Sequence, residues 1–333
     1  MKRLSIFLGF VAWVLTTTVV LATPGSGTTS SVLAWQTFDA VSTAQAAGRE
    51  SVIQEITIAP GGHTGWHTHP GGTFVFVESG TFTIYHSDCT ATTVNAGRGI
   101  FEPGGEVALA RNEGTVPYVL TIVYLDVTSP DGPVRADAAT PACAAGAGLP
   151  TTAAGSLVTA SIIDRATFGS AATITNGDER DIVVQQLTFA PGGHSGWHSH
   201  PGATQIFVVS GTQSFYTTDC VRQNFTAGQG LVEPGGGVQL ARNESTTETL
   251  NLFVVFYDVP RDVAGGFRID QPEPSTCTGL AAVPTTAPAA SALPNTSAAV
   301  TGTSANFAAL AAGFVVLASI SALGVVAVRR RTT

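Results

Sequence analysis

The sequence PGGHTGWHTHPG at residues 60–71 recurs as PGGHSGWHSHPG at residues 191–202. These stretches belong to a longer repeat, because residues 60–112 and 191–243 share 31 identities in 53 positions at a constant offset of 131 without a gap. A copy of this length is too long to be one unit of a solenoid. We therefore expect two whole domains, at residues 32–148 and 156–279, joined by a linker at residues 149–155.

Each copy consists of short β-rich runs. In the first copy these runs are rich in β-branched and aromatic residues, and Gly- and Pro-rich turns separate them at roughly ten-residue intervals; they cover residues 52–58, 73–77, 81–85 and 116–127. No helical period precedes the C-terminal apolar stretch. The pattern predicts an all-β sandwich or barrel.

The spacing of the shared residues resembles the two motifs of the cupin family. The first motif reads Gly, five residues, His-x-His, three or four residues, Glu, six residues, Gly. The second reads Gly, five residues, Pro-x-Gly, two residues, His, three residues, Asn. The positions that fit in the first copy are Gly61, His67, His69, Gly80, Gly97, Pro103, Gly105 and Asn112, and those in the second are Gly192, His198, His200, Gly211, Gly228, Pro234, Gly236 and Asn243.

The resemblance covers roughly residues 50–127 and 180–259. It implies two tandem cupin-type jelly-roll barrels with one small site in each. The sequence departs from the family at two of the four usual metal ligands in each copy. Thr73 and Thr204 stand at the Glu position, and Ala108 and Gln239 stand at the second-motif His position.

Six of the seven histidines lie in the two repeated segments, residues 60–71 and 191–202, which predicts a metal site in each copy. Residues i and i+2 of a strand point to the same face, so the histidines of each His-x-His pair should both face the barrel interior. Neutral imidazoles suit Zn, Fe, Mn, Ni or Cu. The alternative is that these histidines only form hydrogen bonds inside barrels that have lost their metal.

A third histidine in each repeated segment is also a candidate metal ligand. His63 and His194 follow Pro-Gly-Gly turns that permit a fold back over the site. With them, the expected ligands are three histidines per site, plus Gln239 as a weak oxygen ligand in the second domain. The full set of candidate metal ligands is His63, His67, His69, His194, His198, His200 and Gln239. The competing interpretation leaves His63 and His194 in surface loops.

Other residues near the motifs are candidates for a role in the site or in packing. Glu102 and Glu233 precede the second-motif prolines and are candidates for a metal ligand or a catalytic base, or else are solvated turn carboxylates. Trp66 and Trp197 should face away from the histidine pairs and pack on the opposite face. His86 has Thr217 as its counterpart in the repeat and is expected at the surface.

The four cysteines divide evenly between the copies. Three pairings are possible in principle. Because each copy holds two cysteines, we expect Cys89–Cys143 and Cys220–Cys277, each within its own domain.

Both ends of the chain carry targeting signals. Lys2 and Arg3 precede an apolar run, and cleavage of a signal peptide is expected after Ala22; the alternative is an uncleaved N-terminal anchor. Residues 307–328 are apolar and uncharged, long enough for a transmembrane helix, and residues 329–333 form a basic tail that should stay cytoplasmic. Residues 280–306, rich in Ala, Pro, Thr and Ser, should form a stalk. The pentapeptide LPNTS at residues 293–297 resembles a Gram-positive wall-sorting signal, but Ser297 stands where that family has Gly.

These signals predict a single-pass membrane protein with extracellular domains, either retained by a plain anchor or linked to the cell wall. Five of the 15 basic residues lie at the termini, whereas all 23 acidic residues lie between them, so nucleic-acid binding is excluded. Two functions remain open: a surface-displayed module that binds a small ligand or metal, and a metal-dependent surface enzyme of dioxygenase, isomerase or hydrolase type. The missing ligands favour the first.

Overall fold

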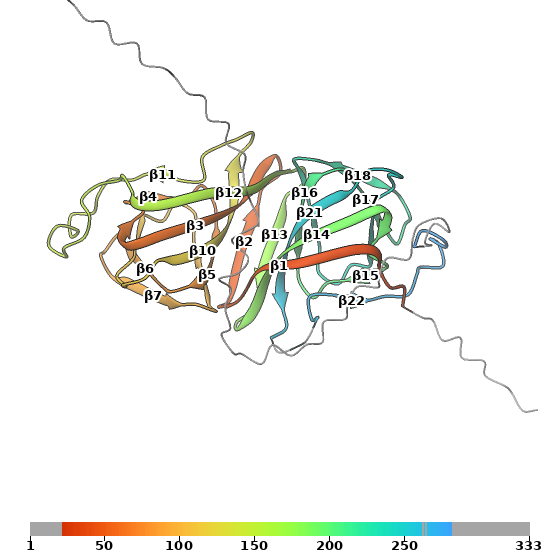
Figure 1. The fold of residues 1–333 in the computed structure, drawn as a ribbon, viewed down its shortest axis with the longest axis horizontal. Helices are drawn as coiled ribbons and strands as arrows, with labels where there is room; N and C mark the ends of the chain where they lie inside the picture. The colour runs from red at the N-terminus through yellow and green to blue at the C-terminus, as the bar shows by residue number, and fades with distance from the viewer. Residues whose placement is uncertain (1–21, 262, 264, 282–333) are drawn as a thin grey trace, which may run out of the picture. The chain divides into compact units, whose positions relative to one another are not determined.

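A computed structural model describes residues 22–261, 263 and 265–281, which form 22 strands and no helix (Figure 1). The sequence prediction of an all-β fold is therefore confirmed. The strands of the first repeat and its flanks are β1 Ser26–Phe38, β2 Val41–Gln45, β3 Arg49–His63, β4 His67–Thr68, β5 Thr73–Ser79, β6 Thr81–His86, β7 Ala91–Asn95, β8 Gly99–Glu102, β9 Ala108–Arg111, β10 Tyr118–Thr128 and β11 Ala136–Asp137.

The second repeat has the same order of strands. They are β12 Ser156–Phe168, β13 Ala172–Asn176, β14 Arg180–His194, β15 His198–Ser199, β16 Thr204–Ser210, β17 Thr212–Thr217, β18 Gln223–Thr226, β19 Gln229–Glu233, β20 Gln239–Arg242, β21 Leu250–Val259 and β22 Ile269–Asp270. Within each copy the central strand pairs on both sides: β10 with β3 and β5, and β21 with β14 and β16.

The long first strand of each repeat joins the sheet of the other repeat. Strand β1 runs antiparallel to β14, with Thr28 opposite Phe189, and β12 runs antiparallel to β3, with Val158 opposite Ile58. Strands β2 and β13 form a separate two-stranded sheet across the same junction. The boundaries predicted at residues 148 and 156 describe the sequence repeat, but strand pairing crosses them.

Three large apolar clusters hold the fold together. One fills the interior of the first barrel and one that of the second. The third contains residues of both repeats, and its aromatic rings meet across the junction: Phe74 lies 5.2 Å from Tyr257 between ring centroids. Burial of these rings, at tens of cal/mol per Å² of apolar surface, couples the two barrels.

The predicted disulfides are both formed. Cys89 is bonded to Cys143 and Cys220 to Cys277. The predicted position of the tryptophans is confirmed as well: Trp66 is fully buried against Leu109 and Leu149, on the face opposite the histidine pair, and Trp197 packs in the same way in the second repeat.

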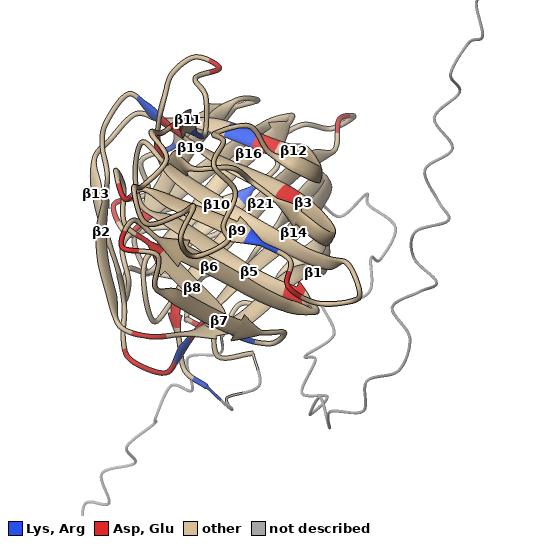
Figure 2. Ribbon diagram, turned by 90° about the vertical axis from the view of Figure 1, so that its left-hand side faces the viewer, with Lys and Arg blue, Asp and Glu red and all other residues tan. Residues whose placement is uncertain are grey.

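Charged residues are sparse on the strands and scattered over the face seen in Figure 2. The part of the chain that the structure describes contains no helix long and apolar enough to span a membrane. The predicted cleavage site borders the described residues. The predicted signal peptide core, the LPNTS pentapeptide, the helix at 307–328 and the basic tail lie outside the described residues, as does nearly all of the stalk. They stay predictions.

Candidate metal centre

His198 on the short strand β15 and His200 directly after it both line the cavity of the second barrel. Gly196 precedes it with φ of +73°, and a Cβ there would lie 2.1 Å from the Thr23 carbonyl oxygen, so this approach of the N-terminal segment requires glycine. The Nδ1–H of His198 donates to the Gly196 carbonyl at 2.8 Å, and that of His200 donates to the Phe267 carbonyl. Because a carbonyl only accepts, both Nε2 atoms keep a lone pair for a ligand or metal.

Glu233 supplies a carboxylate to the same site from strand β19. It lies directly opposite Thr204, which occupies the Glu position of the cupin motif. The carboxylate that is missing from one strand is thus present at the facing position of its neighbour. Glu233 is buried, and its Oε2 lies 3.2 Å from His200 Nε2.

Gln239 holds this carboxylate. It lies opposite His198 on strand β20, and its Nε2 donates to Glu233 Oε2 at 2.6 Å. The sequence suggested Gln239 as an oxygen ligand; in the structure its amide nitrogen faces the site and orients Glu233 instead. Hydrogen bonds of this kind fix a ligating carboxylate and tune its basicity.

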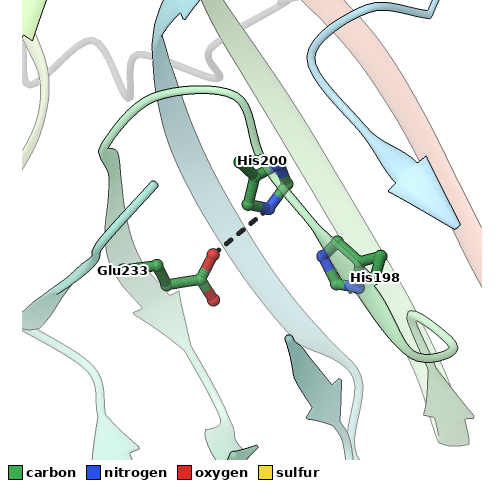
Figure 3. A group of neighbouring side chains, drawn as sticks. All are labelled: His198, His200 and Glu233. Carbon is green, nitrogen blue, oxygen red and sulfur yellow. Dashed lines mark ion pairs between the residues drawn. The ribbon is translucent and has the colours of Figure 1, made fainter. Parts of the chain in front are cut away.

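His198, His200 and Glu233 form a group that could hold a metal ion, with one ligand atom from each residue and all three within 4.8 Å of one another (Figure 3). Two imidazoles and one carboxylate are a ligand set typical of non-haem iron centres, and the same residue types also bind zinc. Burial first, then the charge of Arg268, holds the pKa of His198 well below its usual value, which keeps the ring neutral.

A cavity of about 380 Å³ opens beside this group. Apolar side chains from strands β14, β16 and β21 form most of its wall, whereas Arg268, Asp270 and residues 24–30 form its other side. Two hydroxyls on the wall, Thr28 Oγ1 and Thr204 Oγ1, are buried without a hydrogen-bond partner in the part of the chain described. Buried polar atoms normally have partners, so these two are suited to a bound ligand or water.

The first barrel has the same histidine pair but a different surrounding. His67 Nδ1 donates to the Gly65 carbonyl at 2.9 Å and His69 Nδ1 to the Val134 carbonyl at 2.8 Å. Burial, the largest cause, lowers the pKa of His67 to about 4. Glu102 lies 3.5 Å from His69 Nε2, but Ala108 stands where Gln239 holds the other carboxylate.

The first site also lacks room. Its cavity measures about 30 Å³, close to the share of one water in the liquid. Tyr118 and Phe82 pack edge to face inside this barrel, at a centroid separation of 5.7 Å. The second barrel has Leu250 and Gln213 at the equivalent positions.

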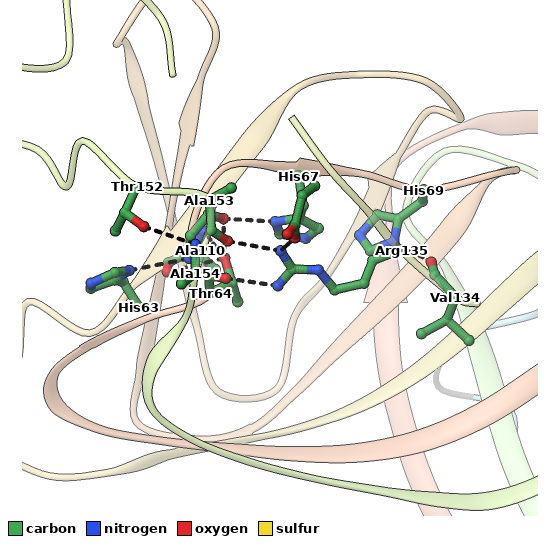
Figure 4. Close-up of polar contacts among 12 residues, drawn as sticks. His63, Thr64, His67, His69, Ala110, Val134, Arg135, Thr152, Ala153 and Ala154 are labelled. Atoms are coloured by element: carbon green, nitrogen blue, oxygen red, sulfur yellow. Dashed lines mark hydrogen bonds and ion pairs between the residues drawn. The ribbon is translucent and has the colours of Figure 1, made fainter. Parts of the chain in front are cut away.

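His63 and His194 are placed apart from both groups. Neither is among the residues that line the two cavities described above, and the Nδ1 of each accepts the main-chain N–H of the second residue after it at 3.1 Å. Figure 4 shows His63 on the far side of Thr64 from the His67–His69 pair. In the second barrel Glu233, rather than His194, lies close to the ligand atoms of His198 and His200, and His194 lies opposite Arg242 on the neighbouring strand, outside the group.

His86 is partly exposed, in line with the prediction of a surface position. Its Nδ1 lies 2.6 Å from Glu106 and its Nε2 lies 3.0 Å from Thr92.

Two segments of the chain match the cupin domain. They are residues 54–124 and 185–256, and they coincide with the two repeats and their histidine pairs. The fold is thus a tandem of cupin-like barrels, as the motifs predicted. No curated protein matches the sequence.

The solved structures that this chain resembles are distant in sequence. The cupin 2 conserved barrel domain protein from Leptotrichia buccalis is 13% identical, with 65% of this chain and 88% of that chain covered and a TM-score of 0.25. Oxalate decarboxylase from Bacillus subtilis is 13% identical over 74% of this chain and 78% of that chain, with a TM-score of 0.33. The coconut allergen cocosin is 12% identical over 71% and 85%, with a TM-score of 0.29. Similarities this low do not bear on substrate.

Sequence reasoning missed Arg268. This residue lies outside the ungapped repeat, and its counterpart in the first copy, Arg135, is offset by 133 positions. The motif Arg-x-Asp, which the two copies share at residues 135–137 and 268–270, could have identified it.

Proposed function

We propose that the second barrel binds a divalent transition metal through His198, His200 and Glu233 and presents it to a small ligand in the adjoining cavity. The observation that carries the proposal is the convergence of three ligand atoms, from β15, the residue that follows it and β19, at the wall of a cavity of about 380 Å³. In this view the first barrel, with its cavity of about 30 Å³, has no room for such a ligand and serves mainly as a structural partner.

The residues present fit a metal. Both imidazoles donate from Nδ1 to a carbonyl and so keep the lone pair of Nε2, the carboxylate is oriented by Gln239, and the Thr204 hydroxyl opposite Glu233 lacks a partner among the described residues. A metal bound here would act as a Lewis acid toward a coordinated water or ligand. The chain's own contribution is to fix the ligands, to exclude bulk water with the apolar wall and to admit the ligand past residues 24–30.

The test is metal content. We expect the full-length chain, purified in detergent with its disulfides intact, to hold one equivalent of Fe, Mn, Zn, Ni or Cu after equilibration with each metal and desalting. His198→Ala with His200→Ala should remove it, whereas His67→Ala with His69→Ala should leave most of it. The proposal would be refuted if only the His67→Ala/His69→Ala variant lost its metal, or if the parent protein held none.

Catalysis is a second candidate, favoured by one observation: the cavity adjoins the metal-binding group directly, so a bound molecule lies within reach of an open metal position. Turnover decides between the two. A binding module returns its ligand unchanged from the metal-loaded protein, and an enzyme converts it, which mass spectrometry of the recovered ligand detects.

We further propose that the barrels are displayed outside the cell on the stalk and the apolar segment at residues 307–328. Its support is the sequence order of signal peptide, domains, stalk, apolar stretch and arginines. Cleavage after Ala22 is compatible with the fold, since Thr23 already bonds to the second barrel through Gln271. Fractionation of cells that carry the intact chain or a truncation after Gly279 tests the anchor; recovery of both in the same soluble fraction contradicts it.

A further inference from the structure

We propose that the second cavity selects a monocarboxylate with an apolar body, and that Arg268 binds the carboxylate. This inference rests on the proposed function in placing a ligand beside the metal-binding group, and it adds the chemical class of that ligand. Arg268 lines the cavity together with His198, His200 and Glu233, and only 20% of its side chain is exposed.

The hydrogen bonds of the guanidinium leave one nitrogen available. An arginine side chain carries five N–H donors. In Arg268, Nε and Nη2 both donate to Asp270 Oδ1 at 2.8 Å, and Nη2 also donates to the Ser195 carbonyl at 2.8 Å. These contacts use three donors and hold the group in place. The two donors of Nη1 have no acceptor among the described residues, although they belong to a largely buried cation at a cavity wall.

Arg135, its counterpart in the first barrel, is arranged differently. Its Nη1 donates to the Thr64 carbonyl at 2.7 Å, and its Nη2 donates to Asp137 at 2.7 Å and to the Ala153 carbonyl at 3.1 Å. Both terminal nitrogens are therefore engaged with the protein, as Figure 4 shows, and Arg135 does not line the small first cavity. The available nitrogen is thus specific to the barrel that has room for a ligand.

The charge balance favours an anion. Asp270 is paired with Arg268, and among the described residues that line the cavity Glu233 is the only other acidic one. Glu233 is the proposed metal ligand, and a divalent ion there would make the site more positive. A carboxylate matches the planar guanidinium and forms charge-assisted hydrogen bonds with it, stronger than those of a neutral amide.

The rest of the cavity favours an apolar body. Its wall opposite the charged side is built from aliphatic and aromatic side chains: Leu187, Phe189, Ile206, Leu252, Val254 and Phe256. A volume of about 380 Å³ lies at the lower end of the range for sites that enclose small organic ligands. A very small, wholly polar dianion such as oxalate would leave this wall without a matching surface.

The first experiment uses the unmodified full-length chain and measures binding by calorimetry. The probes are acetate, butyrate, hexanoate, oxalate and hexanamide. We expect affinity to rise roughly fourfold for each added methylene, which is the ratio that burial of one CH₂ gives. Hexanoate should bind at least tenfold more tightly than hexanamide. If oxalate or acetate binds as tightly as hexanoate, or if the amide matches the acid, the inference is wrong.

The second experiment separates Arg268 from the metal. Arg268→Gln should weaken hexanoate binding roughly tenfold to a hundredfold, the usual range for a lost hydrogen bond to a charged group, and leave hexanamide binding unchanged. Arg268→Lys should restore part of the affinity. Arg135→Gln is the matched control in the first barrel and should change neither. Equal hexanoate binding by the parent and Arg268→Gln proteins would overturn the inference.

Metal content measured on the same samples keeps the two proposals distinct. A parent protein that holds metal but shows no preference for hexanoate over hexanamide refutes only the role of Arg268. After chelation of the metal, hexanoate should still bind more tightly than hexanamide, because the guanidinium remains. A preference that disappears with the metal assigns the carboxylate to the metal and contradicts the role of Arg268.

Discussion

The two barrels share a histidine pair and a carboxylate, yet one encloses a cavity of about 380 Å³ and the other one of about 30 Å³. The repeated histidine-containing segments are nearly identical, so the difference in cavity volume comes from residues around them. Tyr118 and Phe82 fill the first barrel where the second has Leu250 and Gln213, and Ala108 replaces the glutamine that orients Glu233. A duplicated motif therefore conserves the direction of its ligands, while packing and one neighbouring amide decide whether a site is usable.

The carboxylates offer the largest expected difference between the barrels. Glu233→Ala removes a proposed metal ligand and should lower metal affinity at least about a hundredfold, more than is typical for loss of an outer hydrogen bond. Glu102→Ala, the matched change in the first barrel, should have little effect on the same measurement. Metal competition titrations with a chromophoric chelator give both affinities, and equal losses would mean that the two barrels are equivalent.

A second difference lies on strand β5, where Glu78 stands at the position of Val209. Burial, the largest cause, raises the pKa of Glu78 to about 7, although Gln36 and Thr121 hydrogen-bond to it; the nearby charge of Glu55 raises it further. In the folded state Glu78 thus keeps its proton at pH values where the unfolded chain has lost it. Stability contributed by this group is present below about pH 4.5 and is lost as the pH rises to about 7.

We therefore expect Glu78→Gln to increase the free energy of unfolding by about 3 kcal/mol at pH 8, following the equivalence of one pKa unit with about 1.4 kcal/mol. At pH 4.5 the variant and the parent should agree. Denaturant unfolding at the two pH values measures this. Glu55→Gln, an exposed neighbour, is the control and should show a much smaller change; a gain for Glu78→Gln that is the same at both pH values would contradict the titration.

Many features of the fold could be predicted from the sequence, but the pairing of strands between the two repeats could not. The repeat, the His-x-His pairs and the cysteine distribution correctly predicted a tandem all-β fold, inward histidines and both disulfides. These features depend on local periodicity and on the grouping of residues within a copy. The exchange of strands β1 and β12 depends on long-range pairing of segments outside the repeated word, which no local pattern specifies.

The site shows the same limit. Glu233 was a candidate among several because its position opposite Thr204 depends on the register between β16 and β19. Gln239 was recognised at the right position, but which of its two amide atoms faces the site depends on the neighbouring carboxylate. His63 and His194 were expected as ligands from their glycine-rich turns; the turns instead direct them to the main chain two residues on.

Gln239 itself permits a sharper test of what separates the barrels. Gln239→Ala reproduces the alanine of the first barrel and removes the 2.6 Å hydrogen bond to Glu233. Loss of an outer hydrogen bond of this type lowers metal affinity about tenfold or more. The control is Gln185→Ala, which changes another amide on the cavity wall. If Gln239→Ala binds metal as the parent does, orientation of Glu233 is not what distinguishes the sites.

The smallest expected effect concerns Gln213, whose counterpart Phe82 helps to fill the first barrel. Gln213 is fully buried, and neither its Oε1 nor its Nε2 has a hydrogen-bond partner among the described residues. A buried amide without partners is destabilising, so Gln213→Leu should increase the free energy of unfolding by about 1 kcal/mol. Phe82→Leu, its control, removes well-packed apolar volume and should decrease stability. Denaturant unfolding of both variants gives the signs. Opposite signs would show that the first barrel is optimised for packing and that the second retains a polar group at the expense of stability. A loss of stability in Gln213→Leu would mean that the amide has partners in solution, and would remove this contrast between the barrels.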